Sequence, residues 1–257
     1  MQTKKDYTRE EIVMTAKREF LKNGFAKASM REIAKRSGIG LSNIYNYFKS
    51  KDEIFRCIVA PLILKMKEML LEHHNVKYHE QFLKYASGES DEMMTEHVQS
   101  YMELISHYRD ELELILFKAQ GSSLENFIDD YTEMCTKQVL IFMDSFSKKY
   151  PSYGTVKSSF SYHVHTVWMF GFMSEIIKHK LSPKEIENAI EDYIHFEYIG
   201  WRKLLMPTQS LPKGSRRLNI SEYVSGLLPP SPPQGGVDTF FKSKKAPSSP
   251  PRGELFR

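Results

Sequence analysis

The chain has 257 residues, of which 41% are hydrophobic, and its formal net charge is +4. This composition excludes an intrinsically disordered chain and allows one large or two smaller domains. Because no run of about eighteen uncharged apolar residues is present and the first residues are charged, we expect neither a membrane span nor a secretory segment, and we predict a cytoplasmic protein.

The charge is unevenly distributed along the chain. Residues 1–56 contain 13 Lys and Arg against 7 Asp and Glu, residues 57–206 contain 15 against 22, and residues 207–257 contain 8 against 3. A basic first segment before an acidic body indicates that the first segment approaches a polyanion. We therefore predict three parts with these boundaries.

Capping boxes predict where helices begin. In each box a Ser or Thr is followed three residues later by Glu, so that hydroxyl and carboxylate satisfy the free N–H groups of a helix start. The boxes are Thr8 with Glu11, Ser29 with Glu32, Ser50 with Glu53, and Ser182 with Glu185. Apolar residues at helical spacing follow each box and no strand-like alternation of useful length appears, so we predict an all-α protein.

The first part of the chain contains short predicted helices, and the later part contains long ones. The predicted ranges are 9–22, 30–36, 41–48, 52–73, 79–86, 92–119, 123–149, 155–180 and 183–205. Pro61 is expected to kink the fourth helix or to mark a join. Residues 207–257 hold nine of the twelve prolines and lack periodicity, so we predict a disordered, basic tail.

Helices 30–36 and 41–48 flank the glycine-containing turn Ser37-Gly38-Ile39-Gly40. Two short helices joined in this way form a helix-turn-helix unit, whose second helix fits the major groove of DNA. In 41–48 the helical spacing makes Leu41, Ile44 and Phe48 the expected apolar anchors. The residues left for the outside are Ser42, Asn43, Tyr45, Asn46 and Tyr47.

The same region resembles a known family. The matching segments are Thr8-Arg9-Glu10-Glu11-Ile12, Phe20, Gly24-Phe25, residues 28–34, Gly38-Ile39 and residues 44–54. In order and spacing they are similar to the N-terminal domains of TetR-family regulators. The resemblance implies a three-helix DNA-binding domain at 1–56 joined to a larger helical ligand-binding and dimerisation domain at 57–206. It further implies a transcription regulator that is not an enzyme: a repressor, released from a palindromic operator in double-stranded DNA by a small molecule.

The resemblance also assigns roles to residues. Tyr45 and Lys51 correspond to phosphate contacts, and Ser29 and Tyr47 are further candidates for the DNA backbone. Asn43 and Asn46 are predicted to read bases, since a side-chain amide can pair bidentately with adenine. Ser42 and Lys49 complete the predicted DNA-binding set. Where the family often has Ser-Lys-Gly-Thr, this chain has Gly40-Leu41-Ser42-Asn43, and the missing lysine predicts a different operator.

The last two long helices carry more apolar residues than one protomer can bury, which predicts a homodimer. The predicted interface consists of Val164, Trp168, Gly171, Phe172, Ile190 and Ile194. A ligand pocket is expected among the helices of 57–180, although most of their Met, Phe and Tyr residues should be core. The ligand and its binding residues stay undefined.

No cofactor or metal is predicted. The two cysteines, Cys57 and Cys135, are isolated, and the histidines lack the i, i+4 spacing that places two ligands on one helix face. No phosphate loop or nucleophile elbow is visible, so an enzyme is disfavoured. Two alternatives stay open: a helical scaffold that binds proteins, and an activator without a small-molecule ligand.

Overall fold

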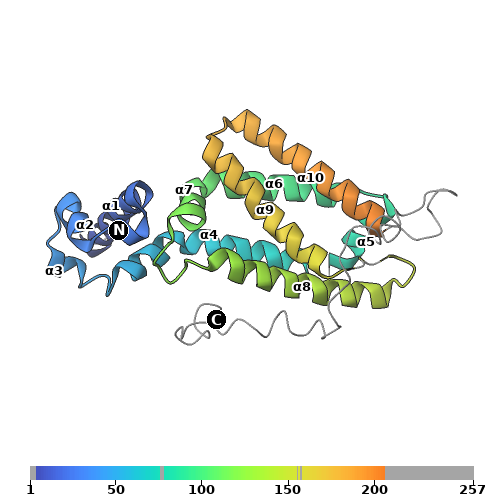
Figure 1. The fold of residues 1–257 in the computed structure, drawn as a ribbon, viewed down its shortest axis with the longest axis horizontal. Helices are drawn as coiled ribbons and strands as arrows, with labels where there is room; N and C mark the ends of the chain where they lie inside the picture. Colours follow the sequence, from blue (N-terminus) through green and yellow to red (C-terminus); the bar gives the residue numbers. More distant parts are fainter. Residues whose placement is uncertain (1–3, 76–77, 155, 157, 206–257) are drawn as a thin grey trace, which may run out of the picture. The chain divides into compact units, whose positions relative to one another are not determined.

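The structure is a computed structural model that describes residues 4–75, 78–154, 156 and 158–205. Its helices are Lys4–Lys27 (α1), Met30–Ser37 (α2), Leu41–Ile44 (α3), Lys51–His73 (α4), His79–Ser87 (α5), Glu92–His107 (α6), Arg109–Glu113 (α7), Phe127–Lys149 (α8), Phe160–His179 (α9) and Pro183–Leu205 (α10). Within the described ranges there is no strand, so the predicted all-α class is confirmed (Figure 1). The tail predicted at 207–257 lies outside the described residues, and the domain boundaries stay a prediction.

Three of the four capping boxes begin a helix. The N–H groups of Glu32 and Glu53 each donate to the hydroxyl of the N-cap serine at 3.1 Å. At Ser182 the box is reciprocal, because its own N–H donates to the Glu185 carboxylate at 2.8 Å. The box at Thr8 is wrong as a helix start, since α1 begins at Lys4. The residues before Thr8 continue the helical conformation, so the motif lies inside the helix.

The helices predicted at 123–149 and 155–180 begin later, at Phe127 and Phe160, and two other predicted helices are interrupted or shortened. The segment 92–119 is interrupted at Tyr108 and continues as α7 and a π-helical turn, Leu114–Lys118. The second helix of the predicted helix-turn-helix unit, residues 41–48, is α-helical only to Ile44; these eight residues are called the recognition segment below. Beyond it the N–H groups of Asn46 and Tyr47 bond three residues back, at 3.1 and 2.9 Å, so the chain tightens into a turn.

Helix α4 connects the N-terminal helices to the rest of the fold (Figure 1). It is continuous from Lys51 to His73 although Pro61 lies inside it. Phe55 in its first half is fully buried against Phe20 and Phe25 of α1, with ring centroids 5.3 Å apart in both pairs. Helix α4 therefore shares a core with the N-terminal helices at one end while its other end reaches into the larger bundle.

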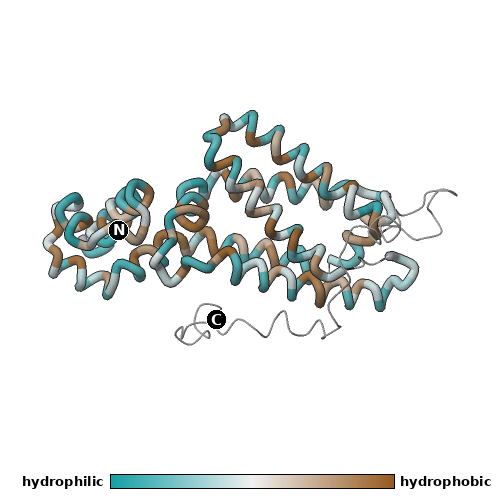
Figure 2. The backbone as a smooth tube through the Cα atoms, viewed as in Figure 1, coloured by the Kyte–Doolittle hydropathy of each residue, from teal (hydrophilic) through white to brown (hydrophobic). Residues whose placement is uncertain are grey.

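The larger bundle consists of α5 to α10 together with the second half of α4. Helix α6 packs along α10, and α8 packs along α9. Figure 2 shows apolar residues along most of α9, whereas hydrophilic residues alternate with them on α10. Among the residues that the structure describes, no helix has a stretch long and apolar enough to cross a membrane.

Candidate functional site

Six of the eight predicted DNA-contacting residues are exposed, at the start of α2, on α3 and in the segment between α3 and α4. Gly38 has φ +68°, a left-handed conformation that glycine adopts at little cost, and it ends α2 so that the chain can turn into α3. Ile44 and Phe48 are buried, and Leu41 is half-buried against the same core. The predicted anchors of the recognition segment are therefore confirmed.

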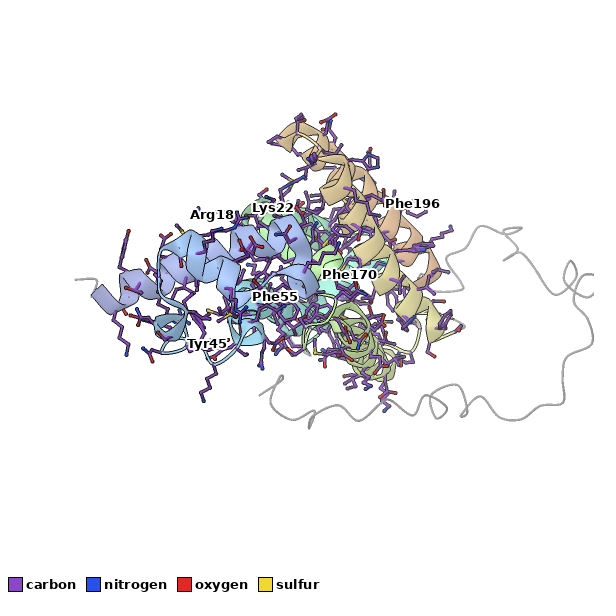
Figure 3. The ribbon with its side chains drawn as sticks, turned by 60° about the vertical axis from the view of Figure 1, so that its left-hand side comes forward. Arg18, Lys22, Tyr45, Phe55, Phe170 and Phe196 are labelled. Atoms are coloured by element: carbon purple, nitrogen blue, oxygen red, sulfur yellow. The ribbon has the colours of Figure 1, made fainter. Side chains whose placement is uncertain are left out.

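The remaining side chains of this segment face outward. Ser42, Asn43, Tyr45 and Asn46 are exposed, and Tyr45 has 49% of its surface free. In Figure 3 Tyr45 lies below the N-terminal helices, whereas Arg18 and Lys22 of α1 lie above them. This leaves a face of small polar groups and one phenol, which suits contact with bases and phosphates.

Asn43 and Asn46 contact each other. The Asn46 side-chain amide donates to Asn43 Oδ1 at 3.3 Å, as their i, i+3 spacing allows. A DNA base edge would compete with this exposed bond, and the two amides would then read the groove as neighbours. Their assignment as base-reading residues stays a prediction.

Lys51 and Tyr47 are less accessible than the rest of the predicted set. Lys51 Nζ donates to the carbonyl oxygens of Phe25 and Ala28 at 2.6 and 2.9 Å and lies 4.2 Å from the Phe25 ring centroid. Partial burial lowers the pKa of Lys51. Lys51 therefore holds the α1–α2 junction in place, a role that the sequence pattern did not indicate. Tyr47 is half-buried and packs against the core.

Ser29 and Lys49 both lie at helix starts. Ser29 is exposed and is the N-cap of α2. Lys49 is exposed and lies two residues before α4. Its backbone N–H donates to Glu53 Oε2 at 2.6 Å, and its side-chain ammonium takes no part in this bond. Helix N-termini carry partial positive charge and free N–H groups, so both positions favour a phosphate.

The comparisons with known proteins agree with this geometry. Residues 12–58 match the model of the bacterial regulatory proteins of the tetR family. The chain carries the helix-turn-helix domain of the TetR family. A curated relative, the uncharacterized HTH-type transcriptional regulator YfiR of Bacillus subtilis (strain 168), is 32% identical over 75 residues, which are 28% of this chain and 37% of that protein. The chain thus matches little more than a third of that relative's length.

Solved structures extend the similarity of fold beyond the TetR-family domain. A TetR-family transcriptional regulator from Syntrophomonas wolfei has a TM-score of 0.51 at 16% identity, covering 77% of this chain and 97% of its own. A candidate fatty acid metabolism regulator from Clostridium perfringens has a TM-score of 0.51 at 15% identity, covering 72% of this chain and 96% of its own. At these identities the likeness shows a shared helical fold.

The predicted dimer residues separate into two groups. Trp168 and Gly171 of α9 are exposed, and Val164 and Phe172 are half-buried. Ile190 and Ile194 of α10 are buried inside the chain, where they belong to its main core. Those two residues are therefore unsuited to contact a second copy, which corrects the prediction.

The structure explains this difference by the two apolar stripes of α10. One stripe, with Ile190 and Ile194, faces the core. The other contains Phe196, which is 70% exposed, and Ile199, which is also exposed. Figure 3 shows Phe196 pointing away from the packed helices. Helical spacing alone does not tell which stripe faces the chain's own core.

A cavity of about 220 Å³ lies between α4, α5, α6, α8, α9 and α10. Its lining is largely aromatic and aliphatic, and it includes Met93, Tyr101, Tyr131, Phe142 and Met143. Histidines and one carboxylate, Glu197, add polar groups. In the described part of the chain no cluster of three or more His, Cys, Asp or Glu is arranged to hold a metal ion.

Polar contacts connect the TetR-family domain to the larger bundle. The Asp52 carboxylate, in the first turn of α4, accepts from the backbone N–H and the hydroxyl of Ser123, both at 2.7 Å. Lys17 Nζ of α1 lies 3.0 Å from Asp110 and 2.9 Å from Glu111 of α7. These pairs are distant in sequence, and no local motif indicated them.

Replacing Asp52 by Ala should expose the Ser123 amide to solvent exchange, because the amide loses its acceptor. We expect exchange in the loop 119–126 to become about 5–10-fold faster, as a lost hydrogen bond to a partly screened carboxylate implies. Hydrogen–deuterium exchange of the full chain measures this. The control is Asp129→Ala, because Asp129 is an exposed acidic residue in the first turn of α8. Equal exchange in both variants would show that the Asp52 contact does not hold the loop.

Proposed function

We propose that this protein is a sequence-specific DNA-binding transcription regulator. The observation that carries the proposal is the recognition segment of its TetR-family domain. There Ile44 and Phe48 are buried, while Ser42, Asn43 and Asn46 are exposed. An anchored helix with outward amide and hydroxyl groups matches what direct reading of the major groove requires.

The regulator acts as a homodimer on a palindromic operator. Several large apolar side chains are exposed on α9 and α10, including Trp168 at 55% and Phe196 at 70%. They support this, since exposed apolar surface marks protein interfaces. A twofold dimer brings the same patch of each copy together. It also presents two recognition segments, which a palindrome with half-sites about one DNA turn apart requires.

A small molecule in the cavity releases this repressor from DNA. Helix α4 supports the mechanism because Met69, Leu70, His73 and His74 line the cavity while Phe55 packs under the DNA-binding helices. A ligand that favours one position of α4 over another shifts the population between two spacings of the recognition segments. The weaker-binding spacing then dominates, and the promoter is freed.

Selection of genomic fragments tests the proposal. Purified full-length protein is mixed with short genomic fragments at physiological salt, and the retained fragments are sequenced. We expect one interrupted palindrome to be enriched. Retained fragments without a shared motif would contradict sequence-specific regulation and favour a nonspecific binder or a protein scaffold.

Substitutions in the recognition segment separate phosphate contacts from base contacts. Tyr45→Ala should weaken binding to operator and to scrambled DNA alike, by about tenfold, because a phosphate contact carries no sequence information. Asn46→Ala should cost about 1–3 kcal/mol on the operator and little on scrambled DNA. Fluorescence anisotropy with both DNAs measures this, with Asn188→Ala on the exposed face of α10 as the control. Equal losses on both DNAs for Asn46→Ala would remove it from base reading.

A further inference from the structure

Glu197 of α10 is a buried carboxylate in the wall of the cavity. Its side chain is 6% exposed. One oxygen, Oε2, accepts from Trp201 Nε1 at 3.0 Å and lies 2.6 Å from His165 Nδ1. The other oxygen, Oε1, is buried and has no hydrogen-bond partner among the described residues. Burying a carboxylate oxygen without a hydrogen-bond donor costs folding free energy, so such an oxygen indicates a place where a bound molecule can donate.

Tyr193 provides a second such group one turn earlier on α10. Its hydroxyl is buried and has no hydrogen-bond partner in the described part of the chain. Its ring stacks on Phe172 at a centroid distance of 4.2 Å, which fixes its orientation. Tyr193 and Glu197 are four residues apart, so both lie on the same face of α10, and both line the cavity. The cavity wall therefore contains two residues, one helical turn apart, whose buried polar atoms a bound molecule could satisfy.

His165 already contacts Glu197 Oε2, and the remaining polar groups of the cavity do not supply a positive charge of their own. Its lining residues include no Lys or Arg. Burial lowers the pKa of His74 to about 4 and that of His97 to about 3, and it also lowers the pKa of His73. These three imidazoles are neutral at pH 7. An anionic ligand would thus meet the Glu197 carboxylate with no Lys or Arg in the lining to balance its charge.

Aromatic rings surround the carboxylate. Tyr162 and Trp201 stack with centroids 5.5 Å apart, and Tyr198 and Tyr101 line the same space. Faces of aromatic rings attract cations, most strongly where water is excluded. The volume of about 220 Å³ is below the range of roughly 300–1,000 Å³ that is typical of drug-sized ligands. The chemistry and the size together favour a small cation with an apolar body.

We propose that the cavity binds a small apolar molecule with a protonated primary amine, whose ammonium group donates to Glu197 Oε1 and to the Tyr193 hydroxyl. The apolar body of the ligand lies among the aromatic and thioether side chains. This assignment rests on the proposed function, because it names the chemical class of the effector that the cavity would accept.

Three probes with one carbon skeleton test the ligand class. Phenethylamine, phenethyl alcohol and phenylacetate are cationic, neutral and anionic at pH 7, and calorimetric titration into the full chain without DNA gives the affinity of each. We expect the amine to bind about tenfold or more tightly than the other two, because only its charged donors match the carboxylate. Equal affinities, a preference for phenylacetate, or no binding of the amine would overturn the proposal.

Substitutions of Glu197 and Tyr193 test whether these two side chains bind the amine. Glu197→Gln should remove the advantage of the amine, about tenfold, and leave the affinity for the alcohol within about twofold. Tyr193→Phe should weaken the amine by about three- to fivefold, since a neutral acceptor is lost. Glu191→Gln is the matched control, because Glu191 is exposed on the same helix, and thermal melting confirms that each variant is folded. An unchanged preference for the amine in Glu197→Gln would overturn the assignment to this carboxylate.

Two readouts keep this proposal separate from the proposed function. If the amine binds through Glu197 but does not change operator affinity, the ligand class is supported and release by an effector fails. If the protein selects a palindrome yet prefers phenylacetate, the regulator stands and the amine class is wrong.

Discussion

Phe196→Glu is expected to convert the proposed homodimer into a monomer and to lower operator affinity by about 10²–10⁴-fold, the usual gain from engaging two linked sites. Phe196 is 70% exposed in the single chain, so the substitution should change the stability of the folded monomer by less than about 0.5 kcal/mol. In the dimer the same carboxylate would be buried against apolar side chains of the second copy, where it has no partner. Burial of an unpaired charge strongly disfavours association.

Light scattering and DNA binding together measure this result. The mass in solution should fall from two copies to one, and a gel-shift titration should show weak binding to operator half-sites. Ile141→Glu is the control, because Ile141 is also an exposed apolar residue, on α8. A Phe196→Glu protein that remains dimeric and binds operator normally would place the interface elsewhere and contradict the proposed dimer face.

Local features of the fold were predictable from the sequence, because local interactions determine them. Ser29 and Ser50 cap the helices that they were expected to begin, since a capping box acts within four residues. The burial of Ile44 and Phe48 follows from their helical spacing and from the polar residues between them. The same local reasoning failed at Thr8, because a cap motif does not report whether the preceding residues are already helical.

Features that depend on distant parts of the chain were not predictable. The choice between the two apolar stripes of α10 depends on where α6 packs, so Ile190 and Ile194 were misassigned to the dimer face. The bonds between Asp52 and Ser123 link residues 71 positions apart. Glu197 reads in sequence as one of several charged residues on an amphipathic helix. Only the folded chain brings its carboxylate to His165 and the cavity.

Phe55→Ala should destabilise the fold by about 3–5 kcal/mol, the range for removing a fully buried aromatic ring. Phe55 meets Phe20 edge to face at an interplanar angle of 78° and Phe25 at 72°. The truncation leaves a void on both contacts and removes the core that α4 shares with α1. Against a total stability of about 5–15 kcal/mol, this loss is large. The melting temperature should therefore fall by roughly 6–20 °C.

Operator binding should fail at the temperature where the Phe55→Ala protein melts, because the same ring supports both α4 and the helices that hold the recognition segment. Thermal denaturation followed by circular dichroism measures the effect, with Tyr7→Ala as the control, since Tyr7 is an exposed aromatic residue on α1. Phe55→Leu keeps most of the volume and should recover most of the stability. If Phe55→Ala melted like Tyr7→Ala, the helices would have closed around the void. The aromatic cluster would then not be what couples α4 to the DNA-binding helices.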